Sequence, residues 1–172
     1  FKNFTQISER LSPEKLVEEL NTCFRAFDHI VSQYNDIEKI KTIGDAYLCA
    51  SGLVHHKTIP KNLVQAALEM QEFLDDHRQE KMKQGEPYFE ARIGIHTGPV
   101  VAGVVGFKKF AYDIWGDTVN IAARMEENCE PGRVNISEAT QGLVRYNFDC
   151  QSRGRFPVKN KGMMEMYYVR KR

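Results

Sequence analysis

The sequence predicts an α+β fold in which one mixed sheet carries helices packed on a face. Residues 13–34 and 60–83 place apolar side chains at the three- and four-residue spacing of amphipathic helices. Shorter segments alternate apolar and polar residues, as half-buried strands do, and turn residues separate them into hairpins. The length of 172 residues is within the range of one domain.

Composition excludes several classes of function. Hydrophobic residues make up 42% of the chain, enough for a core, and 27% charged residues is ordinary for a soluble protein. A formal net charge of +1 provides no field to attract nucleic acid or a membrane surface, and no apolar run approaches the roughly 20 residues that cross a bilayer. We therefore expect no nucleic-acid partner, no membrane insertion of this domain, and a cytoplasmic location, free or as the cytosolic part of a membrane-bound protein. The cysteines, which lack metal-ligand spacing, are expected to be reduced thiols: Cys23, Cys49, Cys129 and Cys150.

The N-terminal residues predict a strand end followed by a long helix. Residues 1–4 are typical of the tail of a strand, and residues 5–10 of a loop. Ser12-Pro13-Glu14 then begins a helix with a capping side chain, a proline in the first turn and an acid. The apolar face of that helix continues to about Tyr34.

A hairpin is predicted next, and it carries a carboxylate. Residues 39–43 alternate apolar and polar side chains, Gly44-Asp45 interrupts the pattern, and residues 46–50 form a second strand. Asp45 is thus held at a tight turn on a rigid support. Taken alone, it could be there for turn chemistry only, because Asp bonds its own backbone in turns.

Residues 54–59 are expected to form a loop. His55 and His56 are adjacent, so their side chains point apart on a strand or loop, and no Cys or acidic neighbour stands at ligand spacing. We therefore do not expect a metal site there. Residues 60–83 form the second long helix, which residues 84–87 end.

The second half of the chain alternates short strands with two further helices. The predicted strands are residues 89–96, 100–105, 111–115, 134–136, 148–150, 154–158 and 166–169. Residues 107–110 form a basic and aromatic loop, and residues 159–162 form a turn. One helix runs to about residue 128 with Asp117 or Thr118 as its cap, and the other runs to about residue 145 with Ser137 as its cap.

Several polar side chains in this half could bind a nucleotide. Asn120 and Arg124 are four residues apart and share a helix face near its N-terminus, which suits a phosphate or a ribose. Asp113 lies in an apolar strand, where an acid either faces solvent at an edge or accepts a specific hydrogen bond. Lys159 lies in a glycine-containing turn and could meet a polyphosphate. Taken singly, Asn120 and Arg124 are better explained by a solvated helix face, and an edge strand and a polar turn are open explanations for Asp113 and Lys159.

Together, five segments resemble the catalytic domain of class III nucleotidyl cyclases, which make cyclic AMP or cyclic GMP for intracellular signalling. The segments are residues 1–5, 39–45, 92–99, 112–125 and 158–162. They occur in the family's order and span nearly the whole chain. The resemblance implies a ferredoxin-like α+β core in one domain, residues 1–172, and a head-to-tail homodimer with nucleotide sites at its interface. Because such domains are often the output end of longer proteins, it also implies an upstream regulatory domain.

The resemblance implies a metal-dependent reaction. Cyclisation is an in-line attack of the ribose 3′-oxygen on the α-phosphorus that expels pyrophosphate, and two Mg²⁺ or Mn²⁺ ions can stabilise the attacking and leaving oxygens. Asp45 matches one of two metal-binding aspartates, and the backbone carbonyl of Phe1 is expected to be a further ligand. In the family's pattern the other aspartate directly precedes Phe1. We therefore expect residues 1–172 to lack that carboxylate and the start of the first strand, and a chain that began at Phe1 would have little activity.

The remaining candidates receive substrate roles from the resemblance. Asn120 matches the residue that orients the ribose, and Arg124 matches the residue that stabilises charge in the transition state. Lys159 matches the lysine that holds the terminal phosphates, although Asn160 follows it where a glycine is usual. In such enzymes one protomer supplies the metal aspartates and its partner supplies the other residues.

Lys41 and Asp113 match the pair that reads the purine. Adenine presents an amino donor at position 6, which Asp113 can accept, and an acceptor at N1, to which Lys41 can donate. Guanine presents the reverse pattern, and mismatched buried polar groups are strongly rejected. The family's guanylyl cyclases carry Glu and Cys at these two positions.

The expected function is therefore an adenylyl cyclase that makes cyclic AMP and pyrophosphate from ATP. The alternative is a catalytically inactive nucleotide-binding or dimerisation domain. The aspartate missing before Phe1 favours that alternative, whereas retention of the other site residues disfavours it. A guanylyl cyclase is the third reading, which Lys41 and Asp113 disfavour.

Overall fold

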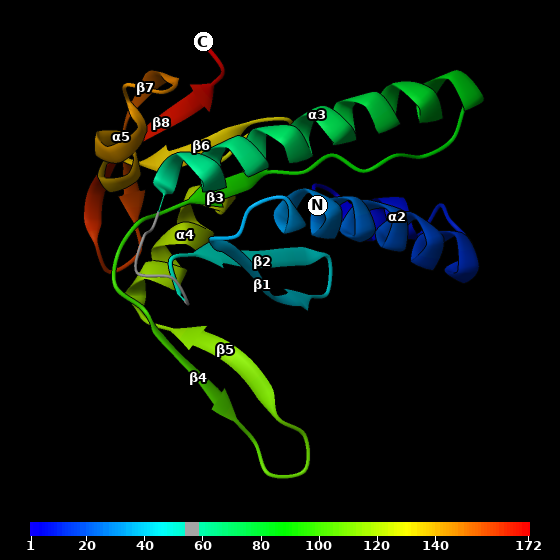
Figure 1. Cartoon of the computed structure of the whole chain (residues 1–172). Helices are drawn as coiled ribbons and strands as arrows, with labels where there is room; N and C mark the ends of the chain where they lie inside the picture. The colour runs from blue at the N-terminus through cyan, green and yellow to red at the C-terminus, as the bar shows by residue number, and fades with distance from the viewer. Residues whose placement is uncertain (54–58) are drawn as a thin grey trace.

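The computed structural model describes residues 1–53 and 59–172. Within these residues the helices are α1 (Phe4–Ser8), α2 (Pro13–Ser32), α3 (Pro60–Gln84), α4 (Asp117–Glu127) and α5 (Glu138–Val144). The strands are β1 (Ile37–Ile43), β2 (Ala46–Ser51), β3 (Ile93–Ile95), β4 (Val101–Val105), β5 (Ala111–Trp115), β6 (Val134–Ser137), β7 (Asp149–Val158) and β8 (Gly162–Arg170). Figure 1 shows their arrangement. The predicted α+β class is confirmed.

The strands form three hydrogen-bonded sheets where one was predicted. The largest has the order β3-β6-β8-β7 and is mixed, because β3 pairs with β6 in parallel and the other pairs are antiparallel. The hairpins β1-β2 and β4-β5 are separate two-stranded sheets. The β4-β5 hairpin projects from the body of the molecule (Figure 1). Alternation within a strand predicts which face is buried and does not identify its neighbour, so the sequence left this division undetermined.

The two long helices lie side by side and bury the apolar faces that their spacing predicted (Figure 1). Their core side chains are Cys23, Phe27 and Val31 on α2, and Ala66, Met70 and Leu74 on α3. Ser12 caps α2 as predicted, by accepting a hydrogen bond from the Lys15 backbone N–H at 3.3 Å. These helices form one wall of the core against which the β1-β2 hairpin packs.

Helix α1 covers residues 4–8, so the prediction of a strand tail over residues 1–4 and a loop over residues 5–10 was wrong. Asn3 adopts a left-handed conformation, with φ of 54°, and α1 follows directly. The Phe1 ring stacks on the Phe89 ring with centroids 4.8 Å apart, and Lys2 N–H donates to the Glu90 carbonyl at 2.7 Å. Because α1 has five residues and no capping side chain, it left no periodic signal in the sequence.

Four predicted strands differ most from the observed bounds. The strand predicted over residues 89–96 is reduced to β3, although Phe89 and Ala91 are buried as its alternation requires. The strands predicted at 148–150 and 154–158 are one strand, β7, because a register shift between Ser152 and Gly154 accommodates the glycine. β8 begins four residues before the predicted start at residue 166.

Other local predictions have mixed outcomes. Ser137 caps α5 as predicted, but the residue at the start of α4 is Gly116, and neither Asp117 nor Thr118 caps that helix. Thr118 instead donates its hydroxyl to the Pro99 carbonyl at 2.7 Å. All four cysteines are free thiols, as expected. The expected loop at 54–59 and its adjacent histidines fall on residues 54–58, outside the described residues.

No helix in residues 1–53 or 59–172 is long and apolar enough to span a membrane.

Candidate functional site

The two residues predicted to read a purine form an ion pair. Lys41 on β1 donates from Nζ to Oδ2 of Asp113 on β5 at 2.6 Å, across 72 positions of sequence. The Asp113 side chain is 18% exposed and the Lys41 side chain 41% exposed. The pair is thus half-buried yet open to solvent, as a binding site requires.

An irregularity in β1 aims Lys41 at β5. The register of the β1-β2 pair shifts between Lys39 and Lys41. In a regular strand, residues two apart point to the same face, whereas here Lys39 contacts Asp28 of α2 and Lys41 contacts Asp113 of β5. Bulges commonly re-aim side chains in this way beside functional sites.

Asp113 is held in its ionised form. The hydrogen bond from Lys41 is the main reason that the pKa of the Asp113 carboxyl lies below its usual range. The backbone N–H of Ile114 adds a second hydrogen bond, to Oδ1 at 2.8 Å. An ionised carboxylate only accepts hydrogen bonds, so this group can bind an amine and cannot donate to a carbonyl.

Asp45 occupies the turn between β1 and β2, as predicted. Gly44 before it has φ of 57°, a left-handed conformation that a tight turn needs and glycine tolerates. The half-buried Asp45 carboxylate accepts from the backbone nitrogen of Phe1, 3.1 Å from Oδ2. Phe1 thus lies beside the turn, and the role of its backbone carbonyl as a further metal ligand stays a prediction.

The donor set at Asp45 fits a metal that a nucleotide helps to bind. Among the described residues, no group of three or more His, Cys, Asp or Glu side chains could hold a metal ion alone. Mg²⁺ is usually bound by one or two carboxylates together with substrate phosphates, so a protein cage is not required. Asp45 supplies a hard oxygen ligand of that kind.

Helix α4 presents Asn120 and Arg124, and it lies directly on β3. The Asn120 side chain is exposed, and Arg124 donates from Nη1 to Glu127 at 2.5 Å. A Cβ added to Gly94 of β3 would lie 2.1 Å from the backbone nitrogen of Glu126. Only a glycine at position 94 allows this contact between helix and strand, which explains one glycine of the segment 92–99.

The turn between β7 and β8 carries Lys159 and lies against the start of α4. Lys161 in this turn forms an ion pair with Asp117 in the first turn of α4. Asn160 has φ of 64°, a left-handed conformation that asparagine tolerates better than most residues. The replacement of the usual glycine is therefore compatible with the turn, and Lys159 remains exposed beside it.

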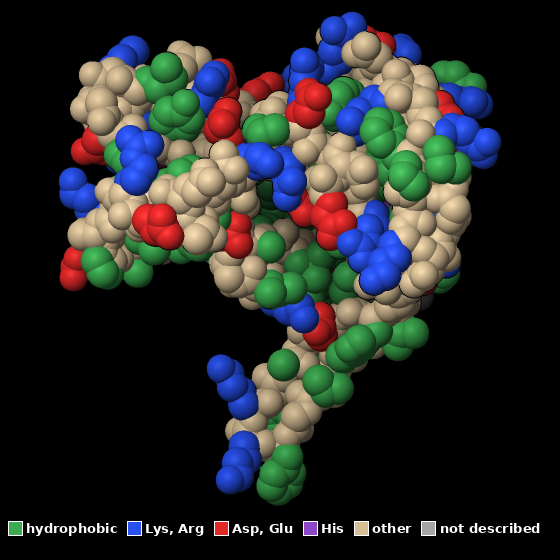
Figure 2. Space-filling view, turned by 180° about the vertical axis from the view of Figure 1, so that it is seen from behind, with side chains coloured by type: hydrophobic (Ala, Val, Ile, Leu, Met, Phe, Trp, Pro, Cys, Tyr) green, Lys and Arg blue, Asp and Glu red, His purple; other side chains and the backbone are tan. Residues whose placement is uncertain are grey.

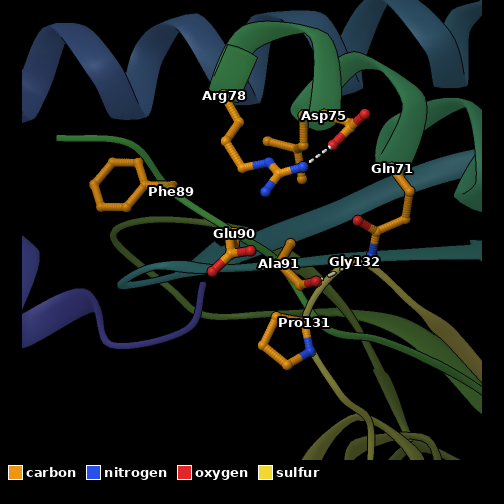
Figure 3. A pocket seen from close by; sticks show the side chains of 9 residues that line it. Gln71, Asp75, Arg78, Phe89, Glu90, Ala91, Pro131 and Gly132 are labelled. Carbon is orange, nitrogen blue, oxygen red and sulfur yellow. Dashed lines mark hydrogen bonds and ion pairs between the residues drawn. The ribbon is translucent and has the colours of Figure 1, made fainter. Parts of the chain in front are cut away.

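The predicted site residues thus form separate groups on one chain: Lys41 with Asp113, Asp45 beside Phe1, and the α4 residues near the turn that carries Lys159. None of them lines either of two hollows that the described residues form. One hollow, of about 300 Å³, lies between α3 and two loops, where Arg78 and Asp75 are paired (Figure 3). Its lining residues are Gln71, Leu74, Asp75, Arg78, Phe89, Glu90, Ala91, Pro131 and Gly132. The other, of about 480 Å³, is lined by Glu138, Ala139, Arg155, Met163, Met164 and Glu165.

The β4-β5 hairpin, which carries Asp113 on β5, also exposes apolar side chains. Phe107 is 92% exposed and Phe110 is 75% exposed at its tip, and Val101 and Val104 are exposed along β4. Figure 2 shows hydrophobic and basic side chains on this projecting hairpin. Exposed apolar patches of this kind mark interaction surfaces. The sequence analysis identified the basic and aromatic loop but gave it no role.

Comparison with known proteins identifies the family of the chain. Residues 1–171 match the model of the adenylate and guanylate cyclase catalytic domain. The chain is 38% identical to the receptor-type guanylate cyclase gcy-4 of Caenorhabditis elegans, over 96% of the chain and 15% of that protein. It is 37% identical to an adenylate cyclase of Mycobacterium bovis, over 96% of the chain and 37% of that enzyme. The chain therefore spans well under half the length of these relatives.

A solved structure extends the agreement to the fold. The adenylyl cyclase CyaB from P. aeruginosa superposes with a TM-score of 0.90 at 27% identity, covering 99% of this chain and 90% of that one. The relatives include both adenylate and guanylate cyclases, so the family leaves the nucleotide open. The matched model, these relatives and the shared fold establish that the chain belongs to the adenylate and guanylate cyclase catalytic domain family.

Proposed function

We propose that this chain is the catalytic domain of an adenylyl cyclase, which converts ATP to 3′,5′-cyclic AMP and pyrophosphate in a homodimer. The observation that carries the proposal is the ion pair between Lys41 and Asp113, with Nζ and Oδ2 2.6 Å apart. Both side chains are accessible, and their donor and acceptor pattern matches adenine.

The purine is selected by hydrogen-bond polarity. The ionised Asp113 accepts from the 6-amino group of adenine, and the Lys41 ammonium donates to N1. Guanine would set its 6-carbonyl against the carboxylate and its N1–H against the ammonium. A site that leaves buried polar groups unpaired rejects the wrong ligand strongly. The arrangement therefore supports ATP over GTP.

The ribose and phosphates would contact the α4 residues and the β7-β8 turn. Asn120 orients the ribose so that its 3′-oxygen lies in line with the α-phosphorus. The always-charged guanidinium of Arg124 stabilises the negative charge that develops on the α-phosphoryl oxygens. Lys159 holds the terminal phosphates, which leave as pyrophosphate. Arg124 must exchange its contact with Glu127 for the phosphate, and both side chains are exposed enough to do so.

Asp45 would hold divalent cations, Mg²⁺ or Mn²⁺, through its carboxylate oxygens. When bound, two such ions stabilise the attacking and leaving oxygens. The turn keeps the carboxylate at a fixed place, because β1 and β2 pair up to the residues on either side of it, Ile43 and Ala46.

A head-to-tail homodimer would complete each site. Within one chain Asp45 and Arg124 belong to separate groups, so a partner that brings its own Asp45 to this chain's α4 supplies what is missing. Lys41 and Asp45, on one hairpin, would then serve two different sites. The exposed apolar side chains of the β4-β5 hairpin support such an association, since burying them against a second copy removes them from water.

Product analysis on the full-length protein tests the proposal. ATP and GTP are supplied separately with Mn²⁺, and cyclic AMP and cyclic GMP are quantified. Cyclic AMP from ATP, with far less cyclic GMP from GTP, supports the proposal. Metal-dependent ATP binding without product would instead indicate an inactive nucleotide-binding domain, and cyclic GMP as the main product would indicate a guanylyl cyclase.

A further inference from the structure

One carboxylate on α2 binds both strands of the hairpin that carries Lys41 and Asp45. Lys39 of β1 places its Nζ 2.8 Å from Oδ1 and 3.0 Å from Oδ2 of Asp28. Tyr47 of β2 donates its hydroxyl to Oδ1 of the same carboxylate at 2.8 Å. Asp28 therefore ties the two strands to each other and to the helix through one group.

The Tyr47 half of this contact is rigid. The Tyr47 ring packs on two rings of α2, with centroids 5.9 Å from Phe24 and 5.5 Å from Phe27. Burial raises the pKa of the Tyr47 hydroxyl, and the hydrogen bond to Asp28 raises it further. The hydroxyl thus stays protonated at physiological pH and remains a donor to Asp28.

The contact points flank the proposed site residues. Lys39 precedes Lys41 by two positions and lies on the other side of the register shift, and Tyr47 follows Asp45 by two positions. Tyr47 pairs with Thr42 across the hairpin, and one further pair, Ile43 with Ala46, separates it from the turn that holds Asp45. A displacement of Lys39 or Tyr47 would therefore move Lys41, Asp45 or both.

We propose that Asp28 is a positioning residue for the cyclase reaction: it fixes the hairpin on α2 and thereby sets where Lys41 meets the purine and where Asp45 meets the metal. The role of the two positioned residues rests on the proposed function. Asp28 itself touches neither substrate nor metal. Its effect would reach two active sites of the dimer at once, because the hairpin serves both.

The test compares Asp28→Asn and Tyr47→Phe with the wild-type full-length protein. The asparagine keeps the size of the side chain, but it loses its charge and one acceptor oxygen toward Lys39. Because displacement of reacting groups by about 1 Å can cost on the order of 10²-fold in rate, we expect Asp28→Asn to lower kcat by about 10- to 100-fold. We also expect the Mn²⁺ concentration for half-maximal activity to rise and the ratio of kcat/KM for ATP to kcat/KM for GTP to fall. Tyr47→Phe has a smaller effect in the same direction.

Asp75→Asn is a matched control. Asp75 is also a helical carboxylate with two side-chain partners, Arg78 at 2.5 Å and Gln79 at 2.9 Å, and it is 52% exposed against 46% for Asp28. It contacts no residue of the hairpin through these bonds. Its replacement should leave kcat, the Mn²⁺ requirement and the nucleotide preference unchanged.

The outcomes separate this inference from the proposed function. Wild-type values of kcat, Mn²⁺ requirement and nucleotide preference in both variants would overturn the positioning role, as would a loss explained entirely by the unfolded fraction. If Asp28→Asn does not fold, Tyr47→Phe carries the same comparison. If the wild-type protein prefers GTP, the proposed substrate is wrong, and the same quantities measured with GTP judge Asp28. If the wild-type protein cyclises neither nucleotide, amide hydrogen exchange over residues 41–46 decides the question. Faster exchange in the variants supports the positioning role of Asp28, and unchanged exchange overturns it.

Discussion

Replacing Asp113 by asparagine tests the purine assignment at a single atom. The carboxylate accepts from Ile114 N–H through Oδ1 and from Lys41 through Oδ2. An asparagine has one oxygen and one NH₂ group, so either orientation of the amide sets a donor against a donor. It also leaves Lys41 without its anionic partner and gives the 6-amino group of adenine a poorer acceptor. Loss of one hydrogen bond between charged and polar groups corresponds to about 10- to 150-fold in an equilibrium constant.

We therefore expect Asp113→Asn to lower kcat/KM for ATP by about 10- to 150-fold, and to lower kcat/KM for GTP much less or raise it. Initial rates with both nucleotides and Mn²⁺ give these values. Asp149→Asn is the control, because Asp149 also pairs with a cation from a neighbouring strand, Arg170 at 2.6 Å, but lies at the far end of β7. The purine assignment is refuted if Asp113→Asn keeps kcat/KM for ATP within about two-fold of wild type, or if kcat/KM falls by the same factor for ATP and GTP.

Three further predictions concern the transition state, the dimer and pH. Arg124→Ala should lower kcat by about 10²–10³-fold with little change in KM, as steady-state kinetics can measure, because its charge is needed most in the transition state. The double replacement Val104→Ser and Phe107→Ser should weaken the homodimer and make specific activity depend steeply on protein concentration, which sedimentation and activity measured over the same concentrations will detect. Burial holds the pKa of His96 below its ordinary value of 6.5, so the unfolded chain takes up this proton more readily than the folded chain. The free energy of unfolding should therefore fall as pH drops through about 6.5 toward the pKa of His96 in the folded chain. In a plot of unfolding temperature against pH, His96→Gln should flatten this region.

The sequence was most informative where local pattern and tertiary structure agree. The hairpin around Asp45 and the helices α2 and α3 have strong periodicity and clear turn or capping residues, and each lies close to its predicted bounds. The adjacency of Lys41 and Asp113 could not follow from spacing, because 72 positions separate them. It was expected only through the resemblance to the cyclase family.

The features that the sequence did not predict depend on contacts between distant segments. Helix α1 is too short to show a helical period. Strand β3 is shorter than the alternating segment 89–96, because a residue is part of a strand only where a neighbouring strand forms hydrogen bonds with it. At the start of α4, Thr118 donates its hydroxyl to the carbonyl of Pro99 in a preceding loop, so it does not cap the helix as the usual preference for Asp or Thr suggests. Asp28 was not a candidate because its partners lie on another element, and an acid on the polar face of a helix carries no signal of its own.

The most direct test of the account is a competition in which the full-length protein receives equal concentrations of ATP and GTP with Mn²⁺, at protein concentrations that form the dimer. The account predicts cyclic AMP as the dominant product, with a preference that Asp113→Asn reduces. Cyclic GMP as the dominant product would contradict the purine assignment, and the absence of both products would contradict the assignment of a catalytic function.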